Sequence, residues 1–340
     1  MKNNSSNRRK SRAILLLLLL LVTGCMLGTS TYAWFTSNKT VGVSDITVNI
    51  AAKNGIQVSV DGTNWKSIVS TTDLLGANTS YTGAKNQIPS LSNSIQPVST
   101  VGTILDGGFM QMFVGDVPSN ESGDYILTSK VSTEAHGNTG DFIAFDIFLK
   151  SDKDVNLDMT GSSGVTANGT DTGIKNASRI AFVVEGNTTV DAQVSTIQSL
   201  GLTAGSTEGI YFWEPNYNVH SKTGIINARD TYGLDILENE EDALAYDGIK
   251  ATIEETDNIL LGDANKTKYP EKFGSVEMDY LTKDTFAGEE TQSIFSLKAG
   301  ITKVRVYMWI EGQDVDCENS ASGGNINYSL QFTIHEDAQN

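Results

Sequence analysis

The 340-residue chain contains very little cysteine, with one residue at Cys25 and a second at Cys317. Cys25 lies in an N-terminal leader, so once the leader is removed Cys317 has no partner for an intramolecular disulfide. This excludes a small secreted scaffold stapled by disulfides, although it does not exclude export. We expect Cys317 to be a small buried hydrophobic residue and not a reactive thiol.

Histidine is also scarce, and its distribution argues against catalysis. His136, His220 and His335 are far apart, whereas a zinc peptidase motif places two histidines and a glutamate on one helix face. The sequence contains no Gly-x-Ser-x-Gly segment and no glycine-rich loop that opens a helix. We therefore predict no catalytic residues and a protein that is not an enzyme.

Basic residues are few outside the N-terminus. The first 33 residues hold five of the 24 basic groups and no acid, which leaves 19 basic against 41 acidic groups and a net charge of −22. A surface of this sign repels nucleic acid and anionic lipid, so we exclude both as partners. It suits a solvated extracellular protein or one that binds cations.

The N-terminus has the order of a secretory signal peptide. The basic stretch NRRKSR precedes the apolar run AILLLLLLLV at 13–22, which is shorter than the roughly 20 residues of a permanent anchor. We expect residues 1–33 to be removed by cleavage between Ala33 and Trp34, after the small residues of TYA. Two alternatives remain: the lipobox-like LVTGC with a lipid on Cys25, and retention of the leader. The membrane is a partner only through this leader or lipid.

Alternating apolar residues predict strands through most of the remaining chain. The clearest candidates are residues 46–50, 56–60, 142–149, 179–187, 304–310 and 326–332. Helix signals are confined to 191–201 and 238–248. Because short strands with long polar connections pack as sheet on sheet, we predict a mainly β, jelly-roll-like antiparallel β-sandwich with long loops and a few short helices. Residues 34–340 form this single domain, with an acidic insertion at about 214–292.

One loop of the predicted sandwich gathers enough carboxylates to bind a hard cation. EGQDVDCENS supplies Glu311, Asp314, Asp316 and Glu318. Oxygen ligands of this kind suit calcium, the candidate cofactor; a solvated acidic loop is the alternative.

The aromatic residues Trp65, Trp213, Trp309 and Tyr211 offer a candidate sugar-binding platform. Trp309 lies opposite the apolar face of its strand, where it could be exposed. Sandwich core or edge positions are the favoured alternative for these four side chains.

Two stretches resemble a known family. TYAWFTSNKTV running into ITVNIAAKNGIQVSVDGTNW, and VRVYMWIEGQDVDCENSASGGNINYSLQFT at 304–333, are similar to the TasA/camelysin-like exported proteins with SipW-type signal peptides. The resemblance implies a jelly-roll fold, processing by a SipW-type signal peptidase and fibres that grow by strand donation. Camelysins carry a peptidase label, which the scattered histidines disfavour.

The segment after the cleavage site is the expected assembly arm. Residues 34–43 carry Trp34, Phe35, Val41 and Val43, and the apolar phase slips at Ser44–Asp45, which predicts a bend or bulge. We expect a secreted structural protein of the bacterial cell surface or biofilm matrix that self-associates into fibres through this arm. The alternatives are a camelysin-like surface peptidase and a monomeric surface adhesin or lipoprotein.

Overall fold

The computed structural model describes residues 40–50, 56–77, 80–81, 94–132, 140–217, 219–222, 224–226, 247–260, 267–281, 291–318 and 321–335. The leader, the cleavage site at Ala33 and Trp34, and Phe35 lie outside these residues. Of the helix expected at 238–248, residues 238–246 also lie outside them, and Asp247 and Gly248 belong to a strand, β14 (Asp247–Ile249). Among the helices within the described residues, none is long and apolar enough to cross a membrane.

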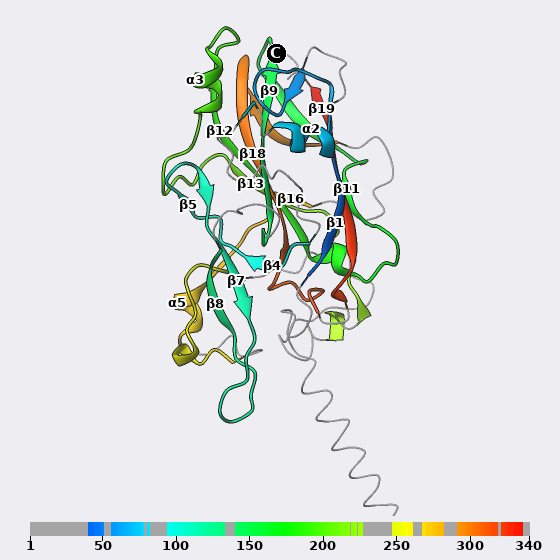
Figure 1. Cartoon of the computed structure of the whole chain (residues 1–340). Coiled ribbons are helices and arrows are strands. Elements are labelled where there is room, and N and C mark those ends of the chain that lie inside the picture. The colour runs from blue at the N-terminus through cyan, green and yellow to red at the C-terminus, as the bar shows by residue number, and fades with distance from the viewer. Residues whose placement is uncertain are drawn as a thin grey trace, which may run out of the picture.

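Two sheets dominate the molecule (Figure 1). The first has the strand order β17 (Thr291–Leu297), β10 (Val155–Thr160), β19 (Asn325–His335), β1 (Gly42–Ile50) and β3 (Ile68–Ser70), and β11 (Gly164–Ala167) also pairs with β19. The second has the order β16 (Tyr280–Leu281), β13 (Ile210–Glu214), β12 (Ser178–Thr188), β18 (Gly300–Glu311), β4 (Pro97–Ser99), β7 (Met112–Asp116) and β8 (Thr128–Ser132). Beside β18 lies β9 (Ile143–Ser151), which pairs in turn with β2 (Gln57–Ser59).

The remaining elements are short. Two small strand pairs join β5 (Ile104–Leu105) to β6 (Phe109–Met110) and β14 (Asp247–Ile249) to β15 (Phe273–Ser275). The labelled α-helices are α2 (Thr71–Gly76), α3 (Val194–Gln198) and α5 (Tyr269–Lys272), and the 3-10 helices are η4 (Ile174–Ala177) and η5 (Glu255–Asp257). Residues 222 and 224–226 are also helical. Each predicted strand listed above falls on a strand of the structure, and α3 lies within the helix predicted at 191–201.

The main core fills the space between the two sheets. It receives every second side chain of β9 and β18, as the alternation in the sequence predicts, together with the inward face of β19. These residues are Ile143, Phe145, Ile147, Leu149, Val304, Val306, Met308, Ile310, Ile326, Tyr328, Leu330 and Phe332. The predicted mainly β sandwich with long loops and a few short helices is therefore confirmed.

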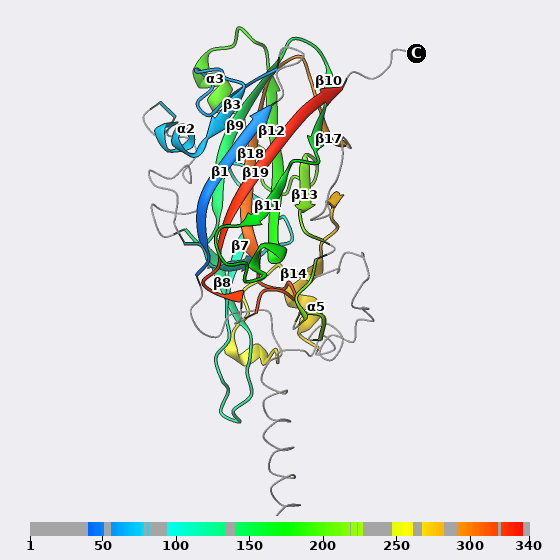
Figure 2. The same ribbon diagram turned by 90° about the vertical axis from the view of Figure 1, so that its right-hand side faces the viewer.

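Three pairings among the described strands differ from the antiparallel prediction. The strands β1 and β19 run parallel over most of their length (Figure 2). Shorter parallel contacts join β13 to β16 and β18 to β4, while the longer ladders of the second sheet are antiparallel. Two parallel neighbours need a long connection between them. Here β1 and β19 are the first and the last strands that the structure describes, so nearly the whole chain lies between them.

The outer face of the second sheet is covered by a second apolar layer. Tyr307 and Trp309 of β18 are fully buried there, and the Tyr307 hydroxyl accepts a hydrogen bond of 2.9 Å from the backbone N–H of Met110. Trp309 is therefore a core residue, as the favoured interpretation of the sequence had it, and not part of an exposed platform, because segments from distant parts of the chain cover this face. The buried residues of the layer are Val98, Ile104, Met110, Met112, Phe142, Ala144, Ala181, Val183, Phe212, Tyr307 and Trp309.

One part of the acidic insertion packs beside the sandwich, whereas β16 and the start of β17 are strands of the two main sheets. Residues of β14, β15 and the 253–259 stretch share a small core with β7 and the loop that leads to β8 (Figure 1). Backbone hydrogen bonds connect Ser129 of β8 with Ile253 in both directions. The core consists of Phe113, Val117, Leu127, Ile249, Ile253, Ile259 and Phe273.

Candidate functional site

Strand β1 lies between β19 and β3 in the first sheet and pairs over most of its length with β19. We call this position between the two strands the seat of β1. Parallel register runs from Gly42 opposite Asn325 to Ile50 opposite Phe332, with a shift between Val43 and Asp45. The shift is the bulge that the sequence predicted at this point. Because a bulge sets two residues against one, it restores the inward phase on both sides of the irregularity.

The placement of Val41 and Val43 corrects the prediction of a free arm. Val41 is fully buried and pairs with Ile95, and Val43 is 4% exposed. Both belong to the main core of their own domain, and Gly42 continues the same strand beside β19. Residues 34–43 were expected to form an arm outside the strand at 46–50. This expectation is wrong for residues 41–43, which lie in the same sheet as that strand.

The opposite edge of β1 is held by fewer contacts. Antiparallel register with β3 covers Thr47, Val48 and Asn49. On either side, the backbone N–H of Ile46 donates to Thr71 Oγ1 at 2.9 Å and that of Ile50 donates to the Ser67 carbonyl at 3.0 Å. The first strand is thus bound along one edge by a long ladder and along the other by a short one.

The loop from β18 to β19 reaches both the start of β1 and a buried charged cluster. At its far end Gly324 accepts a hydrogen bond of 2.8 Å from the N–H of Gly42, and the N–H of Gly323 donates to the Thr40 carbonyl at 3.0 Å. At its near end the loop carries the four carboxylates predicted to bind calcium.

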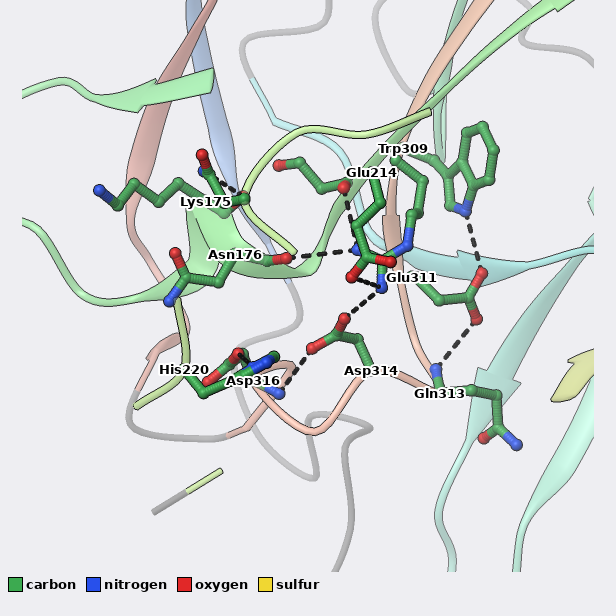
Figure 3. Close-up of polar contacts among 12 residues, drawn as sticks. Lys175, Asn176, Glu214, His220, Trp309, Glu311, Gln313, Asp314 and Asp316 are labelled. Carbon is green, nitrogen blue, oxygen red and sulfur yellow. Dashed lines mark hydrogen bonds and ion pairs between the residues drawn. The ribbon is translucent and has the colours of Figure 1, made fainter. Parts of the chain in front are cut away.

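Those four carboxylates are buried, which corrects the expectation of a solvated loop. Glu311 is 0% exposed, Asp316 is 1%, Asp314 is 5% and Glu318 is 8%. Glu311, Asp314 and Asp316 turn to separate partners (Figure 3). Within the described residues, no group of three or more histidine, cysteine, aspartate or glutamate side chains is arranged to hold a metal ion.

Arg179 of β12 binds two carboxylates of the cluster. Its Nη2 atom lies 2.8 Å from Glu214 Oε1 and 2.5 Å from Asp314 Oδ2. Burial, together with the negative charge of Asp314, raises the pKa of Glu214 to about 7, against the opposing effect of Arg179. A single guanidinium, itself 1% exposed, therefore compensates two buried acids.

His220 and Asp316 form the second buried pair. His220 Nδ1 lies 2.8 Å from Asp316 Oδ2, and the N–H of Ser221 donates to Asp316 Oδ1 at 2.7 Å. Burial alone would lower the pKa of His220, but the hydrogen bond to Asp316 and the nearby negative charges raise it above its ordinary value. Burial also raises the pKa of Asp316.

Glu311 and Cys317 complete the loop. Glu311 accepts hydrogen bonds of 3.0 Å from Trp309 Nε1 and from the N–H of Gln313, and burial raises its pKa to about 7. Cys317 is fully buried, as the sequence predicted, and burial raises the pKa of its thiol well above the ordinary value. Sequence alone indicated the acids, but nothing in it linked them to Arg179 or His220.

A second charged cluster lies under the 194–202 segment. Arg305 Nε lies 2.7 Å from Asp146 Oδ1, Lys303 Nζ lies 2.7 Å from Glu185 Oε2, and the Tyr81 hydroxyl donates to Asp146 at 2.5 Å. All five side chains are buried. This cluster balances two cations with two acids, whereas the first places five acids around Arg179 and His220.

The four aromatic residues of the expected platform do not share a surface. Trp213 belongs to the core between the sheets, whereas Trp309 belongs to the layer on the outer face of the second sheet. The ring of Tyr211 stacks on Phe295 with centroids 5.5 Å apart, and Lys150 Nζ lies 4.5 Å from the Trp65 ring centroid.

Comparison of the chain with protein-family models, with curated proteins and with solved structures finds no match.

Proposed function

We propose that this is an exported structural protein of the bacterial cell surface or biofilm matrix, and that copies join into fibres by exchanging the N-terminal segment that includes β1. The leader with its TYA site supports export, processing by a SipW-type signal peptidase and release of a chain that begins at Trp34. The position of β1 supports the mode of assembly.

The seat of β1 is the observation that carries this proposal. Val41, Val43, Ile46, Val48 and Ile50 all enter the core from one N-terminal segment. Burial of each such side chain is worth about 1.5–3 kcal/mol. Because every copy has the same seat and the same segment, a segment that fits its own domain also fits the domain of a neighbour, which is the basis of domain swapping.

The N-terminal position of β1 makes such an exchange topologically simple. The strand can leave its seat without pulling a loop through the sheet, and the short ladder to β3 is the smaller of its two backbone contacts. The donated segment is then residues 34–50, longer than the arm expected from sequence, because residues 41–43 are part of the seated strand.

A disulfide that locks β1 in its own domain tests the exchange. Asn49 and Gln331 are register partners whose side chains share a hydrogen bond of 2.8 Å. Neighbouring strands lie about 4.8 Å apart, within the Cα separation of about 4.4–6.8 Å that a disulfide spans. The mature chain 34–340 carrying Asn49→Cys and Gln331→Cys would be oxidised as a monomer, and the intramolecular bond confirmed by mass spectrometry.

A matched control places the disulfide elsewhere in the same sheet. Asn156 of β10 and Ser296 of β17 are register partners joined by a side-chain hydrogen bond of 2.7 Å. We expect Asn156→Cys with Ser296→Cys to assemble when oxidised, and the β1 lock to assemble only after reduction, as followed by sedimentation and electron microscopy.

Two outcomes contradict this proposal. Fibres built by the oxidised, internally locked protein would show that β1 is not exchanged. A mature chain that stays monomeric at every concentration, pH and calcium level would remove the fibre function and favour the monomeric adhesin.

A further inference from the structure

The contact between the β18–β19 loop and residues 219–222 and 224–226 does not include β1. The Asp316 carboxylate makes two contacts with this segment. Its Oδ2 atom lies 2.8 Å from His220 Nδ1, and its Oδ1 atom accepts a hydrogen bond of 2.7 Å from the N–H of Ser221. Ser221 Oγ in turn donates to Glu318 Oε1 at 3.2 Å. The loop thus holds this segment mainly through carboxylates.

The packing around Asp316 is too close for any other residue at position 224. A Cβ atom placed on Gly224 would lie 2.6 Å from Asp316 Oδ1 and 3.1 Å from the Val315 carbonyl oxygen. The N–H of Gly224 donates to Ser221 Oγ at 2.9 Å, and the N–H of Ile225 donates to the Ser221 carbonyl at 2.9 Å. Residues 222 and 224–226 are helical, so the start of a short helix packs against one buried carboxylate.

The charges around His220 are mostly negative. Its own hydrogen-bond partner is an acid, and the opposing elements contribute further acids and a single guanidinium. The acids that act on it are Asp316 and Asp314 from the β18–β19 loop and Glu214 from β13. Glu318 of the same loop binds the neighbouring Ser221, and Arg179 of β12 binds Glu214 and Asp314.

We propose that the His220–Asp316 pair is a proton-operated latch, which holds residues 219–222 and 224–226 on the β18–β19 loop while the imidazole is protonated and releases them when it loses its proton. A protonated imidazole donates a charge-assisted hydrogen bond to Asp316, which is stronger than that of a neutral imidazole. Deprotonation also leaves Arg179 as the single cation among the buried acids, and an uncompensated buried charge is strongly destabilising.

The direction of the effect follows from linkage. The pKa of His220 is higher in the closed state than in an exposed segment, so closing takes up a proton. The equilibrium constant for closing is then constant below about pH 6.5 and falls about tenfold per pH unit up to the closed-state pKa. Above that pKa it is level again. The latch is closed in acid and opens in alkali.

Amide hydrogen exchange on the monomeric mature chain measures this equilibrium. The N–H groups of Ser221 and Gly224 report the latch, and the N–H of Val58, which donates to the Lys66 carbonyl at 2.8 Å, serves as the reference. We expect protection of the first two, corrected for the intrinsic exchange rate, to fall from pH 6 to pH 9 in step with the NMR titration of the His220 imidazole. The reference amide should stay protected.

Two variants separate the histidine from the acids around it. His220→Gln should remove the part of the fall that follows the imidazole, and Glu214→Gln should keep it. Asp316→Asn should lower the pKa of His220 toward its ordinary value, which remains measurable even if His220→Gln fails to fold. Protection of Ser221 and Gly224 that stays unchanged while His220 titrates would overturn the latch. The same measurements on the Asn49–Gln331 disulfide monomer keep this result independent of fibre assembly.

Discussion

Val48 of β1 and Leu330 of β19 are register partners in a parallel ladder, and both side chains are fully buried. One comes from the first strand that the structure describes and the other from the last. The core therefore depends on a contact between segments separated by nearly the whole domain, so the N-terminal segment is a structural part of the sandwich as well as the proposed link between copies.

Leu330→Ala should lower the free energy of unfolding by about 2–5 kcal/mol, because it opens a cavity beneath β1. Thr47→Ala, on the opposite face of β1, is the control and should change stability by less than about 0.5 kcal/mol. Chemical denaturation of the monomer measures both. Equal effects of the two substitutions would mean that the seat of β1 is not tightly packed.

Arg179→Met should destabilise the domain by about 3–5 kcal/mol, because it leaves Glu214 and Asp314 buried without their shared cation. Lys298→Met breaks an exposed ion pair with Asp154 and should have little effect, since exposed pairs are screened by water. Urea denaturation at pH 7.5 compares the two variants. A triple variant with Glu214→Gln and Asp314→Asn should recover part of the loss.

The buried glutamate Glu311 should make the protein more stable in mild acid than in alkali. Burial raises its pKa to about 7 in the folded chain from an ordinary 4.5, so folding favours the protonated form. Its contribution is complete below pH 4.5 and disappears as the pH rises through about 7, a change on the order of 3 kcal/mol. Denaturation curves between pH 4.5 and 8 measure the slope, and Glu311→Gln should flatten it. A slope of the opposite sign would contradict the assignment.

The mature protein should begin within two residues of Trp34. The small residues Thr31 and Ala33 precede this position after a ten-residue apolar run. N-terminal sequencing and the intact mass of the protein recovered from the medium identify its first residue. A chain that starts at a lipid-modified Cys25 would support the lipoprotein alternative.

Local pattern predicted the strands well and the burial of β1 poorly. The slip in phase between Val43 and Ile46 correctly indicated a bulge. The assembly arm expected at 34–43 is wrong for Val41 and Val43, because the extra residue of the bulge lets Val43 and Ile46 both point inward. Whether residues 42 and 43 stay in the sheet depends on their pairing with Asn325 and Ile326. These partners lie at the far end of the sequence, so no local pattern reveals them.

The charged cluster escaped prediction for a similar reason. Alternation placed Arg305, Tyr307, Trp309 and Glu311 on the side of β18 away from the main core, and such a face is often solvated. A second layer covers it. The acids of the 311–318 loop find their partners on β12 and in residues 219–222 and 224–226, so their burial is a property of tertiary structure. The sequence alone left a cation site and a solvated loop as the alternatives.

The parallel pairing of β1 with β19 has a directional consequence. Thr40 and Gly42 contact Gly323 and Gly324 at one end of the first sheet, and β19 finishes beside β10 at the other. The chain therefore enters and leaves the sandwich at opposite poles. Copies that pass their first strand to a neighbour in this manner would all face the same way, so the resulting filament would be polar, with two unlike tips that differ in whether a seat or a segment is left unfilled.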